Sequence, residues 1–136
     1  MILVIDTNII IDIFLKREPF FSDSYEAIKK AVVNDAICFV SASAATDIFY
    51  LLKKGLKSTE KAKVSLEMLL KLVNIADVLA LDIQSALSSS MKDFEDAVVQ
   101  AVALRYRADY ILTHNIKDYQ NTGIPAIGPK EFIMLD

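Results

Sequence analysis

The segment Ile2-Leu3-Val4-Ile5-Asp6-Thr7-Asn8 sets the expected fold of this chain. Its four large apolar residues follow one another without alternation and end at a carboxylate. A short, uninterrupted run of this kind is typical of a strand buried on both faces, as in a parallel sheet covered by helices. We therefore expect a strand over residues 2–5, followed by a short apolar helix over 9–15 that Thr7 and Asn8 cap.

The rest of the chain continues this alternation. Short apolar runs predict strands at 36–40, 75–81, 110–112 and 125–129. We expect helices at 22–33, at 41–73 with a break at Gly55 and a restart near Ser58, at 82–88 capped by Asp82, at 94–107 capped by Asp93, and a last turn at 130–134. This order predicts an α/β fold: a three-layer α/β/α sandwich with a mainly parallel sheet of about five strands. The composition is even, so residues 1–136 are expected to form a single domain.

The composition narrows the classes of partner and site. The net charge is −3 and the pI is about 5.1, which taken alone speaks against a nucleic-acid partner. Two bound Mg²⁺ ions would make the charge positive, so a metal-dependent nuclease is not excluded. The single cysteine, Cys38, lies in an apolar run and is expected to be buried, which leaves no Cys-based zinc site.

No segment predicts export or membrane insertion. The apolar run at the N-terminus is too short for a signal peptide, and no stretch approaches the ~18 apolar residues of a membrane span. We expect a cytoplasmic protein with no membrane partner. Hydrophobic residues make up 54% of the chain, and part of this excess is expected to line a homodimer interface.

Polar residues that follow the predicted strands mark the candidate site. In open parallel sheets, ligands bind beyond the carboxyl ends of the strands. The residues expected at that edge are Asp6, Asn8, Ser41, Asp82, Thr113 and Asn115.

The aspartates near this edge each allow two interpretations. Asp6 either caps the first helix or faces the site. Asp93 is expected to be a cap, and Asp96, one turn later, either supports the helix dipole or serves as a ligand. The only histidine, His114, is expected at the periphery or against a phosphate, and no Ser–His–Asp arrangement can be argued.

Asp47 lies on the polar face of an amphipathic helix that also carries Tyr50, Lys53, Lys54 and Lys57. This face is either simply solvated or the wall of a groove in which the lysines contact phosphates. Gathering several acids is costly, because two carboxylates ~4 Å apart repel by roughly 4 kcal/mol at an effective dielectric of about 20. A cation offsets this repulsion, and oxygen ligands favour Mg²⁺ or Mn²⁺ over zinc.

Four segments, taken in order, resemble the PIN domain family, and in particular its VapC-like ribonuclease toxin branch. They are Asp6-Thr7-Asn8, Thr46-Asp47-Ile48-Phe49-Tyr50, Asp93-Phe94-Glu95-Asp96-Ala97 and Thr113-His114-Asn115-Ile116-Lys117-Asp118-Tyr119. The tail Ile127-Gly128-Pro129-Lys130-Glu131-Phe132 is similar to the closing segment of that family. The resemblance covers nearly the whole chain.

The resemblance implies a Mg²⁺- or Mn²⁺-dependent endoribonuclease with an antitoxin protein as partner and RNA as substrate. The implied catalytic residues are Asp6, Asp47, Asp96, Asn115 and Asp118, of which Asp6, Asp47 and Asp96 would be metal ligands. Asn8, Thr113, Lys53, Lys54 and Lys57 would position the substrate. Two positions depart from the family pattern: Asp47 stands where glutamate is common, and Asn115 where aspartate is frequent.

Rival interpretations make different demands on the sequence. A non-catalytic PIN-like module would bind RNA or protein without cutting. A haloacid-dehalogenase phosphatase needs a second aspartate two residues after the first, where this chain has Asn8. A receiver-like signalling domain needs adjacent acids near the first strand, and no convincing pair is present there.

Overall fold

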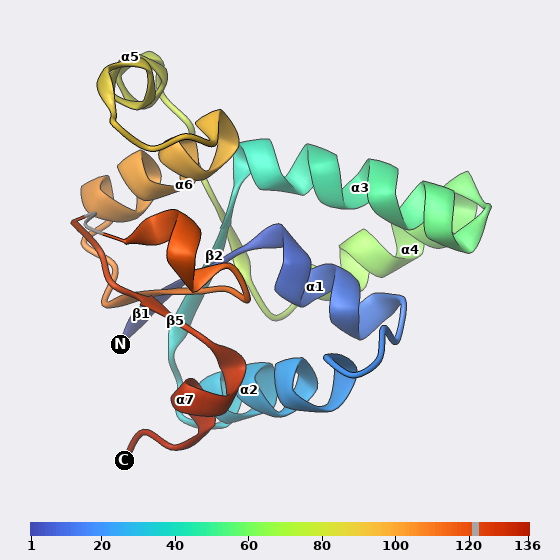
Figure 1. Cartoon of the computed structure of the whole chain (residues 1–136). Helices are drawn as coiled ribbons and strands as arrows, with labels where there is room; N and C mark the ends of the chain where they lie inside the picture. The colour runs from blue at the N-terminus through green and yellow to red at the C-terminus, as the bar shows by residue number, and fades with distance from the viewer. Residues whose placement is uncertain (121–122) are drawn as a thin grey trace.

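A five-stranded sheet forms the centre of the computed structural model, which describes residues 1–120 and 123–136 (Figure 1). The sheet order is β3-β2-β1-β4-β5, and every neighbouring pair is parallel. The strands are β1 (Ile2–Ile5), β2 (Ile37–Ser41), β3 (Asn74–Ala76), β4 (Tyr110–Leu112) and β5 (Ala126–Ile127). The predicted parallel sheet of about five strands is therefore confirmed.

Helices connect successive strands, as parallel pairing requires. They are α1 (Thr7–Phe14), α2 (Phe21–Val33), α3 (Ala42–Leu56), α4 (Thr59–Leu69), α5 (Ala80–Ser88), α6 (Phe94–Arg105), the 3₁₀ turn η1 (Ile116–Tyr119) and α7 (Pro129–Ile133).

The two faces of the sheet are covered by different helices. On one face, Leu3 and Val40 pack into a core with residues from α1, α2, α3, α4 and α7. On the other face, Val4 and Ile111 pack against α6 and η1, while α5 packs against α6. Figure 1 shows α5 and α6 on the side of the sheet away from α2 and α7. These are the three layers that the sequence predicted.

The strand order reverses beside β1, and this places the candidate site. The chain runs outward from β1 through β2 to β3, and then returns to the other side of β1 to form β4 and β5. Ile5 pairs with Leu112 at the carboxyl ends of β1 and β4. The residues that follow, Asp6 and Thr113, therefore leave the sheet side by side at the switch point, where ligands bind in folds of this type.

Several predicted element boundaries were wrong, for local reasons. The strand expected at 75–81 ends at Ala76, because its partner Ser41 is the last residue of β2 and caps α3. The following helix begins at Ala80, so Asp82 lies inside it and accepts a hydrogen bond from the Leu79 N–H. At α1, the capping residue is Asp6 rather than Thr7 or Asn8.

The break between α3 and α4 lies two residues later than predicted. Helix α3 continues through Gly55 and ends at Lys57, which adopts a left-handed conformation with φ of 55°. Ser58 then caps α4 by accepting a hydrogen bond from the Lys61 N–H. Gly55 has a packing role instead, since a Cβ there would lie 2.5 Å from Leu15 Cδ1. The missing side chain lets α3 approach the end of α1.

Candidate active site

Asp6 lies at the base of a cleft at the switch point and is almost fully buried, with 6% of its surface exposed. Its Oδ1 accepts a hydrogen bond from the Thr7 N–H at 2.9 Å, which starts α1. Its Oδ2 accepts one from the Thr113 hydroxyl at 2.8 Å, across from β4. The two interpretations of Asp6 are therefore not exclusive, because the helix cap is also the deepest carboxylate of the cleft.

The cleft has a volume of about 480 Å³ and gathers side chains from four separate segments. Residues of α1 form its floor, α3 and α6 form its walls, and the loop after β4 closes one end. Among the predicted site residues, it is lined by Asp6, Asn8, Asp47, Asp96 and Asn115. The structure thus brings five of the predicted residues into one cavity.

Asp96 lies in the first turn of α6. Asp93 caps this helix, because its Oδ1 accepts a hydrogen bond from the Asp96 N–H at 3.0 Å. Partial burial, as the largest cause, and the negative charges of Asp6, Asp93 and Asp118 together raise the pKa of Asp96 to about 7, against the hydrogen bond from Tyr119. Burial likewise raises the pKa of Asp6, against the hydrogen bonds from Thr113, Thr7 and Tyr119. The carboxylates thus repel one another in the absence of a cation.

Glu95 is a site residue that the sequence analysis did not single out. It lines the cleft opposite Asp47, whose negative charge is the main reason that the pKa of Glu95 is raised. Asp47 has a side chain one methylene shorter than that of a glutamate. Glu95, on the facing helix α6, supplies a longer carboxylate across the cleft from it. Its only signal in the sequence is its place beside Asp96 in the first turn of α6.

Tyr119 is the second residue that was missed. Its ring is buried, and its hydroxyl lies 3.3 Å from Asp6 Oδ2 and 3.3 Å from Asp96 Oδ1. Burial, together with these two carboxylates, raises the pKa of Tyr119, so the hydroxyl keeps its proton and acts as a donor. It bridges the two acids that were predicted to be the main metal ligands.

The donor set of the cleft fits a hard divalent cation. Among the described residues, no three Asp, Glu, His or Cys side chains enclose an ion-sized space. Mg²⁺ is commonly held by only one or two carboxylates together with several waters and substrate phosphates. Asp6 and Asp96, linked through Tyr119, form such an incomplete oxygen shell on an open cleft. Burial is the main cause of their raised pKa values and nearby negative charges add to it, so a cation would stabilise the charged forms of both carboxyl groups.

The remaining predicted residues lie around the cleft. Thr113 is fully buried beneath Asp6, and its Oγ1 accepts the Asn115 N–H at 2.9 Å. Asp118 belongs to η1 and lines a neighbouring hollow, from which its charge still raises the pKa of Asp96. Lys53, Lys54 and Lys57 line a separate hollow that shares Tyr50 with the cleft.

Two residues predicted at the strand ends have other roles. Ser41 is buried and caps α3, with its Oγ accepting the Ala44 N–H at 3.1 Å. Asp82 is buried in α5 and binds Arg105 through both carboxylate oxygens, at 3.2 and 2.8 Å. The expectation that Asp82 follows a strand was wrong because β3 ends six residues earlier, and its carboxylate ties α5 to α6 instead.

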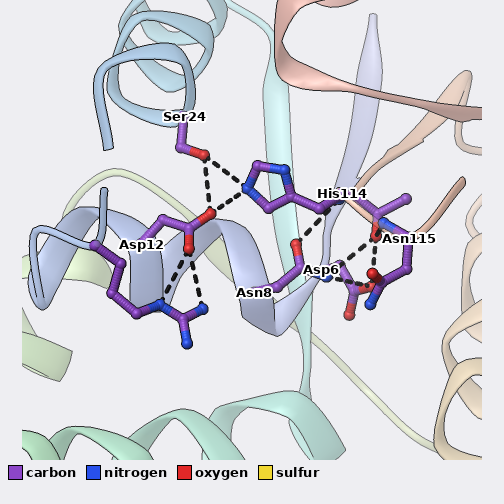
Figure 2. A network of polar contacts seen from close by, with 8 residues as sticks. Asp6, Asn8, Asp12, Ser24, His114 and Asn115 are labelled. Carbon is purple, nitrogen blue, oxygen red and sulfur yellow. Dashed lines mark hydrogen bonds and ion pairs between the residues drawn. The ribbon is translucent and has the colours of Figure 1, made fainter. Parts of the chain in front are cut away.

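A buried network around the C-terminal half of α1 was also not predicted (Figure 2). Asp12, with 0% of its side chain exposed, binds Arg17, Ser24 and the imidazole of His114. His114 therefore does not project into solvent, as a peripheral residue would. Ser24 and Asp12 contact the same ring nitrogen, Nε2, and Ser24 is itself buried, so the three residues are not a nucleophilic triad.

The parallel sheet with an acidic cleft at its switch point defines the class of protein, an α/β/α domain with a carboxylate-lined site. A family model of the PIN domain matches residues 2–117, and the chain belongs to this family. The ribonuclease VapC1 of Aquifex aeolicus (strain VF5) is 26% identical in an alignment that covers 94% of this chain and 90% of that protein.

Solved structures share the fold. One is VapBC2 from Rickettsia felis bound to a DNA fragment from their promoter, with a TM-score of 0.75 and 18% identity over 94% of this chain and 98% of that one. Another is VapBC-1 from nontypeable Haemophilus influenzae, with a TM-score of 0.69 and 21% identity over 96% of this chain and 99% of that one. In the described part of this chain, no helix has the length and apolar character needed to cross a membrane.

Proposed function

We propose that this chain is a metal-dependent endoribonuclease and the toxin component of a toxin–antitoxin pair. The observation that carries the proposal is the convergence of Asp6, Asp47, Glu95 and Asp96 on one open cleft. Membership of the PIN domain family and the likeness to a ribonuclease support the RNA substrate. The likeness to two structures named as VapBC assemblies supports a protein partner.

The residues of the cleft have distinct parts in this proposal. Asp6 and Asp96 are the main ligands of Mg²⁺ or Mn²⁺, and Asp47 on α3 and Glu95 on α6 hold the ion or its waters. When bound, the ion lowers the pKa of a water and stabilises the charge that develops on the phosphodiester. Thr113 and Asn8 donate hydrogen bonds that fix the orientation of Asp6. Asn115, at the rim, positions the water or the phosphate.

The face of α3 offers a path for the RNA backbone. Tyr50 is 65% exposed and lies between the acidic cleft and a hollow of about 410 Å³ that Lys53, Lys54 and Lys57 line. A base stacked on Tyr50 would place a neighbouring phosphate at the lysines and another at the metal. This arrangement lets a chain with net charge −3 bind a polyanion, because the positive charge lies beside the metal site.

A homodimer in the cytoplasm is part of the same proposal. Large apolar side chains are exposed on α5, where Leu81 is 61% and Leu87 is 71% exposed. Such side chains are more common at interfaces than on the free surface of a monomer. Light scattering at micromolar concentration should give twice the mass of the chain, and a mass of one chain would contradict this part of the proposal.

The enzyme should cut single-stranded RNA in Mg²⁺ or Mn²⁺, and excess EDTA should abolish cutting. In Asp96→Asn we expect the rate to fall roughly a hundredfold, because the loss of about 3 kcal/mol of charge stabilisation corresponds to that factor. Asp35→Asn is the matched control, since Asp35 is exposed and stands before β2, at the opposite edge of the sheet. Cutting that persists in excess EDTA, or no cutting at all by the purified dimer or monomer, would contradict the proposal and favour a non-catalytic binding module.

A further inference from the structure

The fully buried carboxylate of Asp12 is the starting point. Burying a charge costs several kcal/mol unless donors surround it. Its donors come from three different segments: Arg17 after α1, Ser24 in α2 and His114 in the loop after β4. Asp12 therefore joins parts of the chain that are about a hundred residues apart in sequence, as Figure 2 shows.

The chemistry of the groups fixes the roles of donor and acceptor. An ionised carboxylate only accepts hydrogen bonds, so the proton of His114 must reside on Nε2, where it points at Asp12. The backbone N–H of the same residue donates to Asn8 Oδ1 at 3.2 Å. His114 is thus held at two points of α1, by its ring at Asp12 and by its backbone at Asn8. These two residues are four apart and share one face of the helix.

This attachment also determines how Asn8 faces Asp6. A backbone N–H can only donate, so the atom of the Asn8 amide that faces it must be the oxygen. The amide nitrogen then points the other way, 3.4 Å from Asp6 Oδ2 and 3.3 Å from Thr113 Oγ1. A continuous set of hydrogen bonds therefore leads from buried Asp12, through His114 and Asn8, to the deepest carboxylate of the cleft.

We propose that His114 and Asp12 are positioning residues for the metal site. They hold the loop after β4 against α1, which orients Asn8 and through it Asp6. The inference rests on the proposed function, because it assigns Asp6 to a metal ion. It goes beyond that function by placing two determinants of metal affinity outside the cleft, since neither residue lines the cavity.

The test compares the Mn²⁺ affinity of two variants that disturb the same carboxylate. His114→Met removes the donor that connects the loop to Asp12, and we expect about a tenfold loss of affinity, as is typical when hydrogen-bond partners of metal ligands are removed. Ser24→Ala is the control, because it also removes a donor to Asp12, and with it a 3.2 Å contact to His114 Nε2, but leaves the hydrogen bond that joins the His114 ring to Asp12 in place. Both variants should melt at a lower temperature than the parent. Only His114→Met should bind Mn²⁺ more weakly, as measured by electron paramagnetic resonance of the free ion.

Asp12→Asn gives a second measurement should His114→Met not fold. The amide keeps the volume and an acceptor oxygen for Nε2–H, while the lost charge weakens the attachment, so affinity should fall less than tenfold but more than in Ser24→Ala. Equal Mn²⁺ affinity in the parent, in Ser24→Ala and in the folded His114 or Asp12 variant would overturn the positioning role and leave a purely structural network. A parent that binds no Mn²⁺ would overturn both this role and the proposed metal site, and so is distinguishable from the first result.

Discussion

At the scale of single residues, the proposed metal site makes Asp96 the side chain at which a proton and a metal ion would compete. Burial and its acidic neighbours raise its pKa to about 7. The raised value means that the folded, metal-free protein binds this proton more tightly than the unfolded chain does. The stability that Asp96 contributes is therefore fully present below about pH 4 and is lost as the pH rises through about 7. A divalent ion bound as proposed would replace the proton and reverse this trend.

Metal affinity should follow the ionisation of Asp96. Below about pH 7, the affinity for Mn²⁺ should fall by up to about tenfold for each unit of pH, because binding must displace one proton. Above about pH 8 it should level off. The measurement is a calorimetric titration with Mn²⁺ between pH 5.5 and 8.5 in buffers of different ionisation enthalpy, which also counts the protons released. An affinity that is constant over this range would show that Asp96 is not a ligand.

The residues that sequence reasoning found and missed differ in a physical way. Asp6, Asn8 and Asn115 were predicted because the carboxyl end of a parallel strand is a fixed place in the fold. Tyr119 and Asp12 were missed, since their roles depend on packing. The Tyr119 hydroxyl reaches Asp6 and Asp96, which belong to different segments, and Asp12 on α1 is covered by the loop that carries His114. Neither leaves a periodic pattern or a spacing in the sequence.

At the scale of elements, α3 has one face that packs in the core and another that lines the candidate site. Its apolar residues Ile48 and Leu52 are fully buried, and its polar face carries Asp47, Lys53 and Lys54, as the amphipathic pattern predicted, while Lys57 follows the last turn. Element types were predictable from such patterns. Boundaries were less so, because they depend on neighbours: β3 stops where its partner β2 stops, and α3 runs on through Gly55 because that glycine packs on Leu15.

Changing Lys53, Lys54 and Lys57 together to glutamine should weaken RNA binding and leave the cleavage rate at saturating RNA unchanged. Each phosphate contact on a single strand contributes about 0.7 to the dependence of log affinity on log salt, so the slope should decrease by about 2. The control changes exposed Lys29, Lys63 and Lys71 to glutamine, which alters the net charge equally. Equal effects of the two triple variants would show that only net charge matters and that α3 carries no RNA path.

At the scale of the whole molecule, the fold holds together a set of charges that oppose it. The sheet brings Asp6 to the switch point, α6 brings Glu95 and Asp96, and α3 brings Asp47. Two apolar cores on opposite faces of the sheet keep these elements in place. Repulsion between these carboxylates should therefore lower the free energy of unfolding of the metal-free protein, and a bound cation should raise it again.

Thermal unfolding of the parent, Asp6→Asn and Asp6→Ala at pH 8, in EDTA and in Mn²⁺, tests this central claim most directly. In EDTA, Asp6→Asn should melt above the parent, because it removes a repelling charge and keeps a helix cap, while Asp6→Ala should lie about 1 kcal/mol below Asp6→Asn through loss of that cap. Mn²⁺ at a hundred times Kd should stabilise the parent by about 2.7 kcal/mol, a rise in Tm of several degrees for a chain of this size, and both variants should lose most of that rise. Two results together would contradict the account and leave Asp6 as a helix cap alone. The Tm of the parent would not change with Mn²⁺, and Asp6→Asn would be no more stable than the parent in EDTA.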